Sequence, residues 1–237
     1  MLLRHNRGFN LVELMVAMVA GLLLVAAASA LFASILKANR TAMQMSRLNQ
    51  ELQSITDMMA RDIQRAGYDA SAAAHTLVSG ATSPFYFDST KHLLNKYSSS
   101  PDQFRCIALK YDERDENATP SPGQPEDNEV VVYSYHSATL GGSVWMAGLP
   151  ASAAEQTSAA LQTLVDACSD EDVADPISTN GAMKITDLTF TLLPSSASSG
   201  ARTIRLTITG NDIKSPALPL TLHCDFNLFN AGYCCCA

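Results

Sequence analysis

Residues 7–36, RGFNLVELMVAMVAGLLLVAAASALFASIL, decide the class to which this chain belongs. Between residues 9 and 36 the only polar side chains are those of Asn10, Glu13, Ser29 and Ser34. A helix over these 28 residues, at 1.5 Å per residue, would be about 42 Å long, which is more than the thickness of a bilayer's hydrocarbon core. The segment therefore predicts a membrane-spanning helix.

Positive charge precedes this apolar segment. Residues 1–8 contain Arg4 and Arg7 and no acidic side chain, so the positive-inside rule places the N-terminus in the cytoplasm and the chain after the apolar segment on the other side of the membrane. A secretory signal peptide has an apolar core of about 7–15 residues. Because the core here is longer, we expect it to be retained as a single-pass anchor.

Glu13 is the one charged residue inside the apolar segment. A lone carboxylate costs about 2.5–3.5 kcal/mol near the bilayer centre, so Glu13 either reaches the cytoplasmic interface or acquires a partner of opposite charge. Residues 7–15, RGFNLVELM, resemble the type IV prepilin signature, in which a basic leader ends in glycine, an apolar residue follows, and glutamate is the fifth residue of the mature chain.

The resemblance implies processing and assembly steps for the N-terminus. Prepilin peptidase would cleave between Gly8 and Phe9 and N-methylate the Phe9 amine, and Glu13 would pair with the N-terminal amine of a neighbouring subunit. Asn10 stands where the family most often has threonine. Residues 9–67 contain no proline, whereas major pilins usually carry one in the membrane helix, and this difference favours a minor subunit.

Helical periodicity continues beyond the apolar segment. Apolar side chains recur at steps of three and four, at Met45, Leu48, Leu52, Ile55, Met59 and Ile63. We expect one continuous helix that ends near Gly67 and covers a sheet with this stripe.

Five later segments are rich in valine, isoleucine, threonine and tyrosine and are expected to be antiparallel strands: 106–111, 129–135, 184–193, 203–209 and 218–226. Residues 151–167 are expected to form a short helix. The predicted fold is α+β and type IV pilin-like, with a long N-terminal α-helix, membrane anchor plus amphipathic stalk, packed on an antiparallel β-sheet head. The predicted parts are a leader (1–8), a transmembrane and polymerisation helix (9–36), a stalk helix (37–68) and a periplasmic head (69–237).

Residues 58–68, MMARDIQRAGY, resemble the end of the stalk helix in PilW-type minor pilins. The charges of Arg61 and Asp62 are interpreted as solvated charges at a helix terminus, and the alternative is a dedicated contact with a partner. The resemblance implies a subunit of the type IV pilus initiation or tip complex. Its partners would be other minor and major pilins, contacted through the N-terminal helix, with prepilin peptidase/methyltransferase, the inner-membrane assembly platform and a tip adhesin. The alternative is a J-type minor pseudopilin of type II secretion.

Six cysteines lie in the exported part, at Cys106, Cys168, Cys224, Cys234, Cys235 and Cys236. An oxidising compartment favours disulfides, but six cysteines allow 15 complete connectivities, so the pairing stays open. The terminal triplet has no second cluster at zinc-binding spacing, and we predict no metal site.

The remaining charged and nucleophilic residues indicate no catalytic centre. The acidic segments 112–116 and 170–175 lack calcium-loop spacing and are interpreted as solvated loops. Histidines 75, 92, 136 and 223 are dispersed and no nucleotide-binding or hydrolase motif occurs, so we predict a non-catalytic protein without a cofactor. Residues 69–237 hold 9 basic and 19 acidic side chains, a net charge of −10, which argues against direct nucleic-acid binding.

Overall fold

The computed structural model describes most of the chain. The described residues are 10–72, 83–96, 100, 102–112, 123–137, 142–170, 172–178, 183–193, 203–213, 215–227 and 234–236, and at 215–217 and 234–236 only the backbone is described. The chain forms two compact units, Met1–Ser46 and Arg47–Ala237.

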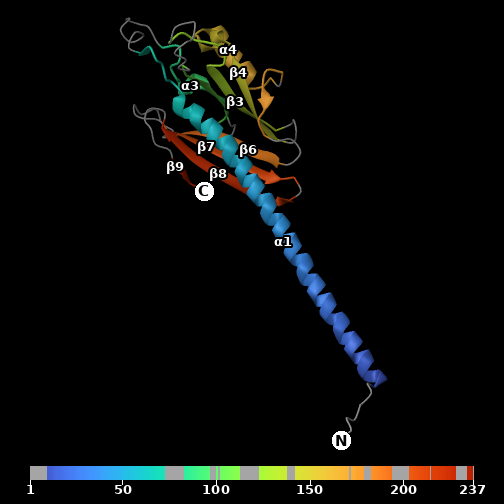
Figure 1. Ribbon diagram of the computed structural model, residues 1–237. Helices are drawn as coiled ribbons and strands as arrows, with labels where there is room; N and C mark the ends of the chain where they lie inside the picture. Colours follow the sequence, from blue (N-terminus) through green and yellow to red (C-terminus); the bar gives the residue numbers. More distant parts are fainter. Residues whose placement is uncertain are drawn as a thin grey trace. The chain divides into compact units, whose positions relative to one another are not determined.

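Helix α1 runs without interruption from Leu11 to Arg65 (Figure 1), which confirms the continuous helix. It ends where Gly67 adopts a φ of +83°, a left-handed conformation that favours glycine after a helix. The Gly67 N–H then donates to the carbonyl of Lys110 at 2.8 Å and so leads the chain onto a strand. Among the described residues, α1 is the helix that is long and apolar enough to cross a membrane.

The strands of the second unit form one antiparallel sheet, which confirms the α+β pilin-like fold. They are β1 (Leu93–Lys96), β2 (Gln103–Lys110), β3 (Val130–His136), β4 (Ser143–Leu149), β5 (Asp175–Pro176), β6 (Met183–Leu193), β7 (Thr203–Asp212), β8 (Ser215–Asn227) and β9 (Cys234–Cys236). Their order is β5-β4-β3-β2-β6-β7-β8-β9, with β1 also paired to β2. The five predicted strands are β2, β3, β6, β7 and β8, and the other four are additions.

The residues Arg47–Arg65 of α1 pack their apolar stripe on one face of this sheet, where the helix crosses β6, β7 and β8 (Figure 1). The stripe residues from Leu48 to Ile63 are buried, while Met45 is half-buried. At Gly210 of β7 a Cβ atom would lie 3.2 Å from the Cδ2 of Leu52. Glycine at this position therefore permits the close approach of helix and strand.

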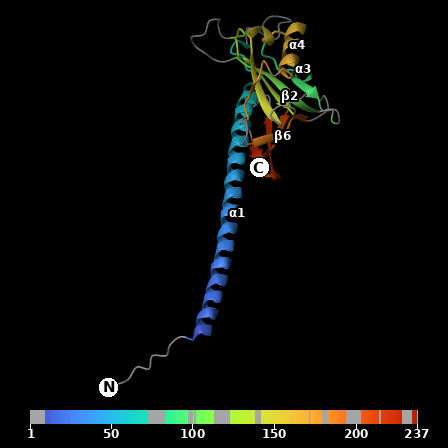
Figure 2. The same cartoon turned by 90° about the vertical axis from the view of Figure 1, so that its right-hand side faces the viewer.

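Two short helical segments cover the other face of the sheet at β2, β3 and β4 (Figure 2). They are a 3₁₀ helix, η2 (Ala151–Ala154), and helix α4 (Ser158–Ala167), so the helix expected at 151–167 occurs in two pieces. Thr157 separates them, because its side-chain oxygen accepts from the Ala160 N–H at 3.2 Å and caps α4. The centre of the sheet is therefore buried on both faces, which accounts for the nearly continuous burial of β2 and β3.

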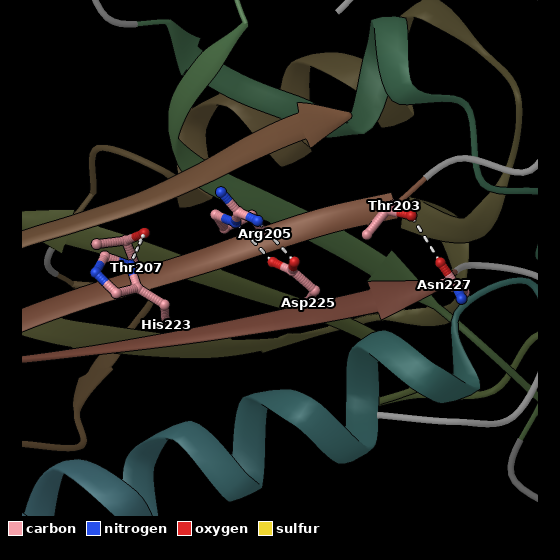
Figure 3. Close-up of polar contacts among 6 residues, drawn as sticks. All are labelled: Thr203, Arg205, Thr207, His223, Asp225 and Asn227. Carbon is pink, nitrogen blue, oxygen red and sulfur yellow. Dashed lines mark hydrogen bonds and ion pairs between the residues drawn. The ribbon is translucent and has the colours of Figure 1, made fainter. Parts of the chain in front are cut away.

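Strands β7 and β8 carry polar side chains on the face away from α1. Cross-strand pairs join Thr203 to Asn227, Arg205 to Asp225 and Thr207 to His223 (Figure 3). The side-chain hydrogen bonds from Arg205, at 2.7 and 2.8 Å, lower the pKa of Asp225 despite its partial desolvation. These residues alternate with buried isoleucines and leucine of β7, so one face of the strand pair contacts solvent and the other contacts α1.

His92 is the last residue of the short helix α3 (Ser89–His92) and is fully buried. Its Nδ1 accepts from the Asp88 N–H at 2.9 Å, which places the ring proton on Nε2. The Nε2 atom has no hydrogen-bond partner among the described residues. Burial, and secondarily the charge of Lys110, lowers the pKa of His92 to about 4.

We expect this histidine to make the head less stable in acid. Its pKa in the folded chain lies below the value of 6.5 for an exposed histidine, so the unfolded chain takes up the proton first as the pH falls. Neutral His92 therefore makes its full contribution to the free energy of unfolding above pH 6.5. This contribution is lost as the pH falls to about 4, and the total loss is about 3 kcal/mol. Denaturant unfolding at several pH values should show a shallower loss for His92→Asn, whose amide oxygen can still accept from Asp88. An equally steep loss in this variant would contradict the assignment.

Candidate functional site

The first turn of α1 contains Glu13, the charged residue of the apolar segment. The helix begins as the N–H groups of Glu13 and Leu14 donate to the carbonyl of Asn10 at 3.0 and 3.2 Å. A carboxylate in this position interacts favourably with the positive end of the helix dipole. Gly8 and Phe9, where cleavage and methylation are expected, lie outside the described residues.

The apolar side chains that follow Glu13 are exposed around the whole circumference of the helix. Leu11 and Leu24 are each 72% exposed, and no residue from Leu11 to Arg40 is buried. Such a surface is unfavourable in water, at about 25 cal/mol for each Å² of exposed apolar area. It is stable when lipid or other apolar helices cover it, and Glu13 lies at one end of it.

At the other end of α1, Asp62 fastens the helix to the sheet. Its two carboxylate oxygens accept from the hydroxyl of Tyr111 at 3.1 Å and from the hydroxyl of Tyr133 at 2.5 Å. Tyr133 is fully buried on β3, and Tyr111 directly follows β2. Burial, followed by the hydrogen bond to Asp62, raises the pKa of the Tyr133 hydroxyl, which stays a donor.

The interpretation of Asp62 as a solvated terminal charge is therefore wrong. Its carboxylate is half-buried and has two tyrosine donors, 49 and 71 residues away in the chain. Both tyrosines lie in predicted strands, and the register of β2 and β3 places them on one face of the sheet. The sequence alone indicates neither this register nor the acid that they contact. Arg61 is exposed, as expected.

A disulfide joins Cys106 of β2 to Cys168 at the C-terminal cap of α4, with 5.9 Å between the Cα atoms. It fastens α4 to the sheet face opposite α1, in a core formed with Ala108, Val132 and Trp145. An expected disulfide is thus present. Cys224 is buried on β8.

The three terminal cysteines lie in β9, and Cys235 is the backbone partner of Cys224 in register. The side chains of Cys234, Cys235 and Cys236 lie outside the described residues, so their pairing stays a prediction.

Three described acidic residues near the loops accept hydrogen bonds from backbone N–H groups. Asp112 accepts from the Ala70 N–H, Glu129 from the Glu126 N–H and Asp127 from the Ala151 N–H. Within the part of the chain that the structure describes, no group of three or more histidine, cysteine or acidic side chains is arranged to hold a metal ion.

The described histidines lie on separate elements. His92 accepts from Asp88, His136 contacts Ser134, and His223 contacts Thr207. His75 lies outside the described residues.

A long apolar N-terminal helix with glutamate in its first turn, continued by an amphipathic segment on an antiparallel sheet, defines a type IV pilin-like protein. The prokaryotic N-terminal methylation motif matches residues 3–29. The model of the family prepilin peptidase-dependent protein B matches residues 41–227, more than three quarters of the chain, and the chain belongs to this family. No curated protein and no solved structure matches it. The methylation motif and the apolar helix fit a pilin anchored in the inner membrane.

We expect loss of the Cys106–Cys168 bond to destabilise the head. The bond closes a loop with a sequence separation of 62, and removing a native disulfide of this kind typically costs about 2–5 kcal/mol. The double variant Cys106→Ala, Cys168→Ala should unfold at correspondingly lower denaturant than the oxidised wild type. Peptide mapping after alkylation of intact cells should recover the two cysteines as one linked pair, and recovery of both as free thiols would contradict the bond.

Proposed function

We propose that this protein is a minor pilin that prepilin peptidase processes and that takes part in assembly of a type IV pilus, in the initiation or tip complex. The observation that carries the proposal is the exposed apolar surface of α1 with Glu13 in its first turn. In the inner membrane that surface contacts lipid. In a filament it contacts the equivalent helices of other pilins.

Three features support a minor pilin rather than a bulk subunit. The helix is continuous from Leu11 to Arg65, and residues 9–67 contain no proline of the kind usual in major pilins. Residues 58–68 resemble the PilW-type pattern.

Glu13 supplies the specificity of assembly. A carboxylate held among apolar helices is stable when a positive charge compensates it, and the methylated amine of Phe9 on an adjoining subunit is such a charge. In the free, membrane-anchored chain Glu13 lies near the cytoplasmic interface, where water solvates it. Docking of the next subunit therefore replaces hydration by an ion pair, and a misaligned subunit would leave both charges unpaired.

Processing is expected at the bond between Gly8 and Phe9. Intact-mass measurement of the protein isolated from its own membranes should show loss of residues 1–8 and gain of one methyl group. Gly8→Ala should slow cleavage, because the peptidase acts beside a residue with a minimal side chain. A mature N-terminus at any other residue would contradict the assignment.

Assembly is expected to depend on the Glu13 carboxylate. In Glu13→Ala, cleavage, membrane insertion and head folding should be normal, since removing the charge makes the anchor more apolar. The incoming amine would be buried without a counter-ion, at a cost of about 3–5 kcal/mol, so the amount in sheared filaments should fall at least tenfold relative to the processed amount in membranes.

Glu51→Ala is the matched control for this experiment. Glu51 lies on the same helix but pairs with Arg47 at 3.6 Å, outside the apolar segment, and its loss should leave incorporation within about twofold of the wild type. Normal incorporation of Glu13→Ala would refute the assembly mechanism. Wild-type protein that supports secretion and is absent from surface filaments would indicate a pseudopilin instead.

A further inference from the structure

A surface groove of about 570 Å³ lies beside the last turns of α1. Its apolar part is formed by Ile55 and Met58 of the helix and by Ile177, which follows β5. Ile177 is fixed in place because its N–H donates to the carbonyl of Val144 on β4 at 2.9 Å. Ile55 is buried, whereas Met58 and Ile177 are half-exposed, so the groove presents a small hydrophobic surface to solvent.

Two arginines, Arg61 and Arg65, lie one helical turn apart along this groove and are exposed. The structure holds each in a defined place, because Arg61 Nε donates to the Asp57 carbonyl at 3.3 Å and the Arg65 guanidinium lies 5.0 Å from the ring centroid of Tyr111. Neither forms an ion pair with a carboxylate of the described residues. Asp62 also lines the groove, but both of its carboxylate oxygens already accept hydrogen bonds from the two tyrosines.

The helix terminus alone does not account for this arrangement. A positive charge in the last turn complements the negative end of the helix dipole, and Arg65 fits that role. Arg61 lies before the last turn, however, and repels Arg65 across a spacing of four residues. The dipole also offers no reason for half-exposed Met58 and Ile177 beside the two charges.

The groove has the chemistry to bind carboxylates. Guanidinium groups form bidentate hydrogen bonds with carboxylates, and an apolar side chain between two acids would cover Met58 and Ile177. Residues 69–237 carry a net charge of −10, so the two arginines form a basic site on an acidic protein. The overall negative charge disfavours a long polyanion such as a nucleic acid and is compatible with a short acidic peptide.

We propose that this groove binds an acidic peptide segment, with an apolar side chain between its carboxylates, on a neighbouring pilin-like subunit. The neighbour's identity as a pilin rests on the proposed function, whereas the recognition of an acidic, apolar segment rests on the groove alone. Contact here would join the heads of adjoining subunits, in addition to the contact of their N-terminal helices.

The test uses the full chain in a non-ionic detergent and a fluorescent peptide in which leucines alternate with pairs of glutamates. Fluorescence anisotropy should show saturable binding that weakens as salt is added. A matched peptide with glutamine in place of glutamate should bind at least tenfold more weakly. Reversing both charges, with Arg61→Glu and Arg65→Glu, should weaken the glutamate peptide at least tenfold.

The matched control is the double variant Arg40→Glu, Arg47→Glu, which changes the net charge equally at exposed positions of α1 outside the groove. Its affinity should stay within about twofold of the wild type. Circular dichroism checks folding, and if the reversed variant is unfolded, the milder Arg61→Gln, Arg65→Gln variant should still weaken binding several-fold.

Equal binding of the two peptides, an unaffected reversed variant, or equal displacement by a single-stranded oligonucleotide of the same charge would overturn the proposal. The outcome is independent of filament incorporation. A groove that binds the peptide in a chain that never enters filaments would refute the proposed function alone, and incorporation without peptide binding would refute the groove alone.

Discussion

The hydrogen bonds that Tyr111 and Tyr133 donate to Asp62 hold the C-terminal part of α1 on the sheet. They fix the rotation of the helix about its axis. With Asp62 on the tyrosines, Met59, one helical turn before it, and the adjacent Ile63 are buried against the sheet. Removing either donor would leave one oxygen of the half-buried carboxylate without its tyrosine partner, which is costly.

The same tyrosines come from β3 and from the residue after β2, two strands that are covered on both faces of the sheet. The tyrosine side chains point to the α1 face, so the neighbouring positions of each strand point to η2 and α4. On that second face Cys106 joins Cys168, and the Nζ of buried Lys110 donates to the carbonyl of Ala154 at 3.0 Å. Burial lowers the pKa of Lys110 to about 8. Polar or covalent contacts therefore hold α1 on one face of the sheet and η2 and α4 on the other. The residues that make these contacts come from the same two strands.

The sequence predicted the features that depend on local pattern. The apolar run, the stripe from Leu48 to Ile63 and the glycine at position 67 determine α1 through composition, period and backbone conformation. Strands β2, β3, β6, β7 and β8 follow from their β-branched and aromatic residues.

The sequence did not predict the features that depend on residues far apart in the chain. Strand β4, SVWMAGL, becomes a strand by pairing with β3 over its whole length, and β1 and β9 are short edge pairings. The partners of Asp62 and the groove at Arg61 and Arg65 arise only when residues from the helix, the strands and position 177 come together. The cleavage and methylation site at Gly8 and Phe9 was predicted from the motif, and it is tested by processing rather than by the fold.

The most direct test of this account is a double-mutant cycle between Asp62 and Tyr133. The free energy of unfolding would be measured by denaturant titration for the wild type, Asp62→Asn, Tyr133→Phe and the double variant, each as the full chain in non-ionic detergent. If the carboxylate and the hydroxyl hold helix and sheet together, the two substitutions should be coupled by about 1–3 kcal/mol. Additive effects, to within about 0.5 kcal/mol, would contradict the claim that this contact fixes α1 on the sheet.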